Sequence, residues 1–321
     1  MIKSLVFLWG RRRWVAAFGL AIGLCLADGN GSFLALAGSG WARPRVVATT
    51  TLIADWVEQV GQDRIQLTSL LQPGMDPHVY EPTPADGVAL EQADLVFWNG
   101  YNLEPGLMRL IEATAQQARR VALAEILDPI VTNEEDGIPT PDPHVWGNVE
   151  NVIRMVERIA QELAEQVPGE ATFFQTNAAA YRAELEELHA WIGEQIQTIP
   201  PPNRVLVTTH DAFAYYTQAY GLKMGRSLLG ISTEEQPSAQ TVARLVAEIR
   251  ALQVPAVFAE TTLNPALIQT VAAEAGVKVA EQKLYSDSLG EPGSGAETYV
   301  AMMRHNTCTI VVALGGSPEC S

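Results

Sequence analysis

The 321-residue chain has little cysteine and little positive charge, and each shortage excludes a class of function. Its 3 cysteines form neither a Cys-x-x-Cys pair nor a Cys/His pattern, so a zinc finger is excluded. Its 37 acidic residues outnumber its 21 basic ones, and the formal net charge is −16. A field of that sign disfavours nucleic acid and anionic membrane surfaces as partners, and it attracts cations.

Signatures of common catalytic sites are also missing. The chain has no His-Glu-x-x-His pairing and no Gly-x-Ser-x-Gly elbow, which argues against a zinc protease and a serine hydrolase. Gly290, Gly293 and Gly295 precede a predicted helix, but their spacing matches neither phosphate-binding pattern. We interpret this run as a flexible loop that leads into the last helix.

No apolar run is long enough to span a bilayer comfortably. The N-terminus has Lys3 and arginines at 11–13, then an apolar stretch over 14–27, and a small-residue cleavage site at 35–37. Residues 1–37 are therefore predicted to be a secretory signal peptide, which places the mature protein in the periplasm. A retained anchor helix is the alternative.

Removal of this segment changes the charge and the cysteine balance. Four basic residues and one acidic residue are lost, so the formal charge becomes −19. Cys25 follows Leu24, where a lipoprotein signal would have a small residue, so no lipid anchor is expected. Cys308 and Cys320 remain, and in an oxidising compartment they can pair and tie the C-terminal tail to the last helix.

Strands and helices alternate along the mature chain. A composition of 47% apolar and 18% charged residues suits a soluble globular protein, and the length suits two domains. Runs rich in β-branched residues, such as 46–51 and 204–208, are followed by helical spacing. This alternation predicts an α/β fold with two lobes, at 44–168 and 201–316, each with a parallel sheet flanked by helices.

One long helix is predicted to join the two lobes. Apolar residues recur at steps of three and four from Phe174 to Ile199, and three prolines at 200–202 end the pattern. About 28 helical residues span roughly 42 Å, more than one small domain, so 169–200 is assigned as a linking backbone helix. A coiled-coil segment is the alternative. The acidic, proline-rich residues 125–143 are expected to form a surface loop.

The tetrapeptide Asp-Pro-His-Val occurs twice, at 76–79 and at 142–145. Proline fixes its own φ and keeps the preceding residue out of the α region, so His78 and His144 are expected on stiff, extended loops. Such loops suit metal ligands, and the repetition favours a shared role. The alternative for either copy is an ordinary Asp-Pro turn with its imidazole in solvent.

His78 and His144 come after predicted strands, and so do two further side chains. His210 comes directly after the strand that begins at Arg204, and Asp287 lies on the loop after the strand near Val279. Taken singly, His210 is also typical of a helix start and Asp287 of a turn. Ligands in open parallel sheets bind beyond the carboxyl ends of the strands, so all four side chains are predicted to converge in the cleft between the lobes.

Three imidazoles and one carboxylate suit a borderline divalent ion. Zinc fits this set, and manganese or iron(II) is tolerated if the carboxylate binds through both oxygens. Calcium and magnesium require more oxygen ligands. Imidazole binds a metal in its neutral form, so metal affinity is expected to fall below about pH 6.

Four stretches carry a family resemblance, namely DPHVYEPTPAD (76–86), PDPHVW (141–146), TTHDAFAYYTQAYG (208–221) and LYSDSLGEPGSGAETYVAMMRHNT (284–307). Together they resemble the substrate-binding proteins of zinc- and manganese-importing ABC transporters, the cluster A-I (ZnuA/TroA-like) family. The resemblance covers essentially the whole mature chain. It implies a metal ion held between two lobes by the residues matching His78, His144, His210 and Asp287.

The resemblance also implies delivery of that metal to a membrane permease driven by an ATPase. We accordingly expect a monomeric binding protein that is not an enzyme. A zinc-dependent hydrolase with the same ligands and a water in an open position is one alternative. A metal-binding surface adhesin is another.

Two departures from the family pattern leave the metal open between Zn²⁺ and Mn²⁺, with Fe²⁺ as a third candidate. Many manganese-type members have Glu at the position of His210, so the histidine here favours zinc. Many zinc-type members carry a histidine-rich loop between the first two ligands, and residues 125–143 contain no histidine.

Overall fold

The computed structural model describes residues 43–133 and 139–320, and from Arg43 onward they form one compact unit. The predicted signal peptide at 1–37, with Cys25, lies outside the described residues. Among the helices that are described, none combines the length and the apolar character needed to cross a bilayer.

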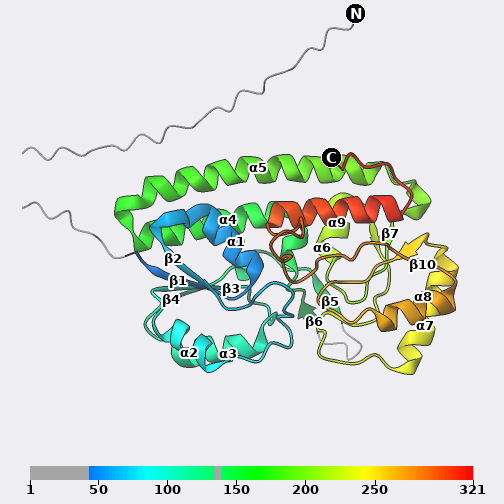
Figure 1. Ribbon diagram of the computed structural model, residues 1–321, viewed down its shortest axis with the longest axis horizontal. Helices are drawn as coiled ribbons and strands as arrows, with labels where there is room; N and C mark the ends of the chain where they lie inside the picture. Colours follow the sequence, from blue (N-terminus) through cyan, green and yellow to red (C-terminus); the bar gives the residue numbers. More distant parts are fainter. Residues whose placement is uncertain (1–42, 134–138, 321) are drawn as a thin grey trace, which may run out of the picture. The chain divides into compact units, whose positions relative to one another are not determined.

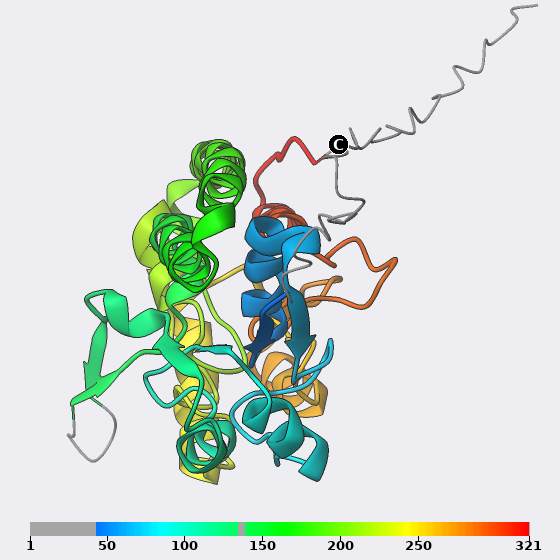
Figure 2. The same ribbon diagram turned by 90° about the vertical axis from the view of Figure 1, so that its left-hand side faces the viewer.

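Four parallel strands form the N-terminal sheet, in the order β2-β1-β3-β4 (Figure 1). They are β1 (Arg45–Ala48), β2 (Gln66–Ser69), β3 (Leu95–Trp98) and β4 (Arg119–Ala122), and the helices around them are α1 (Thr51–Gly61), α2 (Pro84–Glu91) and α3 (Pro105–Thr114). Successive side chains of a strand point to opposite faces, so Val46 and Ala48 share a core with α1, and Val47 shares one with α2 and α3. Both faces of the sheet are therefore covered, as Figure 2 shows end-on.

The C-terminal half repeats this arrangement with shorter strands. It contains β7 (Val205–Leu206), β8 (Lys223–Met224), β9 (Ala256–Val257) and β10 (Lys278–Val279), together with α6 (Ala214–Tyr220), α7 (Ala239–Leu252) and α8 (Ala266–Ala275). The parallel pairs β7–β8 and β9–β10 are joined where the Phe258 N–H donates to the Val207 carbonyl at 2.9 Å. The two pairs are separate two-stranded sheets, and this bond places the end of β9 beside the end of β7, as β3 lies beside β1 in the N-terminal sheet.

Three long helices pack beside the two sheets. They are α4 (Val149–Gln166), α5 (Ala171–Gln197) and α9 (Tyr299–Ala313). The 27 residues of α5 span about 40 Å, and this helix packs against α1, α4, α6 and α9 (Figure 1). The predicted α/β fold, with parallel sheets flanked by helices and one long helix, is confirmed.

Several local boundaries differ from the sequence-based expectation. The loop 125–143 contains an antiparallel hairpin of β5 (Val131–Asn133) and β6 (Pro139–Pro141). The last helix, α9, begins at Tyr299, where the Thr298 hydroxyl accepts the Ala301 N–H and caps it. On the long helix, Nδ1 of His189 lies 3.2 Å from the Tyr220 hydroxyl. Short 3₁₀ turns occur at Gln62–Arg64, Ala124–Ile126, Val145–Gly147, Pro168–Glu170 and Pro201–Asn203.

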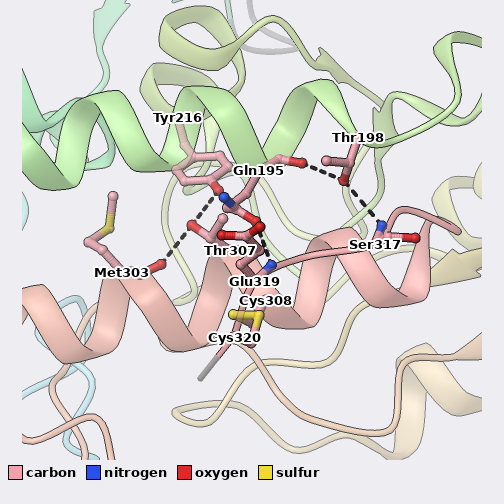
Figure 3. Close-up of a disulfide and its surroundings, with 9 residues drawn as sticks. All are labelled: Gln195, Thr198, Tyr216, Met303, Thr307, Cys308, Ser317, Glu319 and Cys320. Atoms are coloured by element: carbon pink, nitrogen blue, oxygen red, sulfur yellow. Dashed lines mark hydrogen bonds between the residues drawn. A yellow bond between two sulfur atoms is a disulfide. The ribbon is translucent and has the colours of Figure 1, made fainter.

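A disulfide ties the C-terminal tail to α9, as the cysteine count allowed. It joins Cys308 and Cys320, whose Cα atoms are 6.0 Å apart (Figure 3). The tail also contacts the end of the long helix, because the Glu319 N–H donates to Gln195 Oε1 at 2.7 Å and the Ser317 N–H donates to the Thr198 hydroxyl at 3.2 Å. The tail is thereby fastened to both α9 and α5.

Candidate metal centre

Three of the four predicted ligand residues follow parallel strands, and the loop of the fourth is held to the end of another. His78 is on the loop after β2, His210 follows β7, and Asp287 is on the loop after β10. His144 precedes a 3₁₀ turn, and its loop is held to the end of β3 because the Asn99 amide donates to the Pro143 carbonyl at 2.9 Å. Parallel strands place these ends on one edge of each sheet, which is where ligand sites are built.

Both Asp-Pro-His copies form the same local turn. The Asp76 Oδ1 accepts the His78 N–H at 2.9 Å, and the Asp142 Oδ1 accepts the His144 N–H at 2.9 Å. This side-chain-to-backbone bond, together with the rigid proline, directs each imidazole before any ligand binds. The expectation of stiff histidine loops is thus matched by the geometry.

The structure brings all four predicted side chains together. One nitrogen or oxygen from each lies within 4.8 Å of the others. The Nε2 atoms of His78 and His144 are 3.2 Å apart, and the Asp287 oxygens lie 3.2 Å from His210 Nε2 and 3.6 Å from His144 Nε2. His144 and His210 are fully buried, Asp287 is 1% exposed and His78 is 5% exposed.

Carboxylates behind the cluster orient two of the rings. The Asp142 Oδ1 lies 2.8 Å from Nδ1 of His144. The Glu260 Oε2 makes an off-axis contact of 2.5 Å with Nδ1 of His210, while its Oε1 accepts the N–H groups of Thr209 and His210 at 2.9 Å. The Asp142 contact is a hydrogen bond that places the ring proton of His144 on Nδ1, so the Nε2 lone pair of this ring faces the cluster.

Ionisation within the cluster favours a cation at its centre. Burial lowers the pKa of His78 to about 3, so this ring is neutral at neutral pH. Burial opposes the charged forms of Asp287 and His210 as well, but the positive charge of His210 holds the Asp287 pKa well below its usual range. Glu260 and Asp287 in turn raise the His210 pKa well above its usual value. A proton on His210 thus occupies the position that a metal ion would take, and metal binding would release it.

Orphaned polar atoms in the cluster provide an independent test of fit. Both oxygens of Asp287 and Nε2 of His210 are buried without a hydrogen-bond partner in the described part of the chain. Buried groups of this kind are costly unless they are hydrogen-bonded or coordinate a metal. Three nitrogens and a carboxylate with two free oxygens fit zinc and tolerate manganese or iron(II). The residues present therefore fit the expected ion.

Sequence reasoning missed the supporting carboxylates. Asp142 was considered only for its turn, and Glu260 was not considered. Glu260 follows the end of β9 by three residues and is fully buried, although acidic residues are rarely buried unless paired. An acidic residue closely following a buried strand was the available signal. Its partner His210 is 50 residues away, so the pairing itself could not be read from the chain.

Comparisons with known proteins show which family the chain resembles. A family model described as "Zinc-uptake complex component A periplasmic" (ZnuA) matches residues 46–313, which include all four clustered residues. The manganese-binding lipoprotein MntA of Halalkalibacterium halodurans is 36% identical over 270 residues, which cover 84% of this chain and 88% of the relative. The zinc-binding protein TroA of Treponema pallidum is 34% identical over 307 residues, which cover 94% and 99%.

The solved structure of the periplasmic zinc-binding protein TroA from Treponema pallidum has the same fold. It superposes on this chain with a TM-score of 0.81 at 33% identity, covering 85% of this chain and 99% of that one. The similarity is thus one of sequence and of three-dimensional structure, and it extends over both sheets and the helices beside them.

Proposed function

Since this chain belongs to the ZnuA family of periplasmic zinc-uptake components, we propose that it binds one divalent transition-metal ion and delivers it to an ABC import permease. The observation that carries the proposal is the set of four buried ligand atoms within 4.8 Å of one another. The relatives named above include a manganese-binding and a zinc-binding protein, so Zn²⁺ and Mn²⁺ are both proposed as cargo. His78, His144, His210 and Asp287 are proposed as the ligands.

The protein is proposed to hold its ion without catalysis. Catalytic zinc generally has three protein ligands and a water in an open position, whereas four protein ligands here can close the coordination shell. Two carboxylates beside the cluster, Asp142 and Glu260, each direct an oxygen at a histidine Nδ1 atom and so support a ring. A binding role therefore explains their placement.

The remaining organisation follows from the same proposal. We place the two lobes at 44–168 and 201–316, and we assign 169–200 as the backbone helix between them. The protein acts as a monomer in the periplasm after export by the segment 1–37. Its partners are the permease and the ATPase of the importer. A strongly acidic surface suits a protein that collects cations, with a formal charge of −16 for the whole chain.

Metal titration of the purified protein tests the proposal. The protein is expected to bind one equivalent of Zn²⁺ or Mn²⁺. His210→Ala should weaken this binding by more than about 100-fold, because loss of a ligand exceeds the ten- to hundredfold cost of losing a ligand's supporting partner. His189→Ala is the matched control, since His189 lies on α5 and bonds Tyr220. Equal binding by His210→Ala and the native protein would contradict the proposal.

Elemental analysis can distinguish the two metals. The protein should be taken from its native compartment, because first-row metals follow the Irving–Williams order and zinc outcompetes manganese in most recombinant preparations. Zinc or manganese in one equivalent identifies the cargo. A protein isolated with neither metal would count against the proposed function.

A further inference from the structure

Two loops that occupy matching positions in the two sheets meet beside the metal centre. Loop 70–83 follows β2 and carries His78, and loop 225–238 follows β8 and carries none of the predicted ligands. In each half the sequence Ser-Leu-Leu leads into the loop, and its serine hydroxyl donates to the carbonyl two residues later at 2.8 Å. Both strands also pair in parallel with the first strand of their sheet. The loops are therefore structural counterparts.

One hydrogen bond joins the two loops. The Thr233 hydroxyl donates to Oδ2 of Asp76 at 2.6 Å, although the two residues are 157 positions apart. Thr233 is only 7% exposed, and Asp76 is half-buried, so the bond is partly shielded from water. The other oxygen of the same carboxylate accepts the His78 N–H at 2.9 Å. A single side chain thus connects the C-terminal loop to the backbone of a predicted ligand.

A second contact holds the same segment from the C-terminal half. The Gly74 N–H donates to the Ser288 hydroxyl at 2.8 Å, and Ser288 adjoins Asp287. Residues 74–78 are therefore fastened at two points, and only the Thr233 bond acts on the carboxylate that also holds the His78 backbone.

His78 depends on this fastening more than the other two histidines do. Within the described residues, carboxylates pair with Nδ1 of His144 and of His210, and none pairs with Nδ1 of His78. The direction of the His78 ring is therefore set by its loop. Since the loop is held through Asp76, whatever orients Asp76 also orients His78.

We propose that Thr233 is a positioning residue that holds His78 on the bound ion through Asp76, and so sets how long the ion is retained. This inference rests on the proposed function. The bond joins the two halves of the molecule, so it forms only when both loops are together and is lost when they separate. Thr233 itself contributes no ligand atom.

The test is the rate of zinc release from the zinc-loaded protein, measured by exchange of bound zinc for isotopically labelled zinc. Thr233→Val keeps the side-chain shape and removes the hydroxyl, so release is expected to be roughly tenfold faster, the effect typical of one hydrogen bond to a charged group. Thr233→Ser restores a hydroxyl and is expected to restore the native rate. Thr217→Val is the matched control, because its buried hydroxyl bonds the Ala214 carbonyl within α6.

A positioning role requires that metal-free Thr233→Val melts at the native temperature. The proposal is overturned if Thr233→Val releases zinc at the native rate, if Thr233→Ser fails to restore that rate, or if the metal-free variant is destabilised as much as the loaded one. Absence of zinc and manganese binding in the native protein would instead refute the proposed function. The two failures are thus distinguishable.

Discussion

The two Asp-Pro-His-Val copies have the same sequence and the same turn, but they support their histidines differently. In the second copy Asp142 uses one oxygen for both the His144 N–H and Nδ1, and all of these atoms are buried. In the first copy Asp76 uses one oxygen for the His78 N–H and sends the other to Thr233 in the C-terminal half. The His144 ring is thus held by its own motif, whereas the aspartate that holds the His78 backbone is itself held from across the molecule.

This difference shows what a short motif can and cannot determine. The tetrapeptide determines the turn, because proline and aspartate act through the local backbone. The surroundings of each copy determine the second contact of its aspartate. These surroundings differ, because Val145 of the second copy is fully buried whereas Val79 of the first is 49% exposed. Glu260 gives His210 the support that Asp142 gives His144. The three rings therefore divide into two that are held by carboxylates and one that is held by its loop.

Replacement of the carboxylate behind His210 is expected to give the largest loss of affinity among these supports. Glu260 uses one oxygen for two backbone N–H groups and the other for the ring. Glu260→Gln has only one oxygen, and an amide N–H facing the ring would move the ring proton to Nε2, the atom that binds metal. The zinc dissociation constant should rise about 10- to 100-fold in a competition titration.

Glu104→Gln provides the control for that experiment. Glu104 is also fully buried, and its Oε1 accepts the Thr49 hydroxyl at 2.9 Å and the Asn99 N–H at 2.6 Å, but no imidazole contacts it. Native zinc affinity is expected for this variant. If both variants lost affinity equally, the effect of Glu260 would be general and not exerted through His210.

The two aspartates should differ when each is made neutral. Asp142→Asn keeps an oxygen for the His144 N–H and Nδ1 but loses its charge, so zinc affinity should fall about fivefold, the difference between a charged and a neutral hydrogen bond. Asp76→Asn keeps an oxygen for the His78 N–H, and its amide can donate to Thr233, so about a twofold loss is expected. Paired titrations of both variants check this order, and a larger loss for Asp76→Asn would reverse the comparison.

The smallest effect on affinity, but a clear effect on stability, is expected at Glu104. Burial raises its pKa to about 7, from 4.5 in an unfolded chain. Between these values the native state binds more protons than the unfolded state, so the free energy of unfolding falls as pH rises. Glu104→Gln cannot ionise, and its advantage over the native protein should grow from almost none at pH 4.5 to about 3 kcal/mol above pH 7. Urea unfolding at pH 5 and pH 7.5 measures this growth, and an equal advantage at both would refute it.

Much of the fold could be predicted because its signals are local. Strand–helix alternation and the long apolar stripe predicted parallel sheets and α5. The hairpin within 125–143 could not be predicted, since prolines at both ends of β6 read as loop residues. Helix ends are also weakly marked in the sequence. Apolar spacing continues to Ala118, although α3 ends at Thr114 and β4 begins at Arg119.

The predicted ligand set was recovered as a cluster because His78, His210 and Asp287 follow strands and His144 repeats the motif of His78. The contacts that orient those residues could not be recovered in the same way. Glu260 and Thr233 act on residues 50 and 157 positions away, and neither lies in a motif. The first pairing is set by the neighbouring ends of β7 and β9, and the second by how the two halves face each other. Composition and spacing specify neither.

The near-complete burial of the four ligand atoms has a kinetic consequence under the proposed function. An ion that has shed its water shell inside the protein is out of reach of scavengers in the surrounding fluid. Its escape then depends on mechanical separation of the two halves, not on the abundance of competitors. A permease that pulls the halves apart would therefore decide both the moment and the place of unloading.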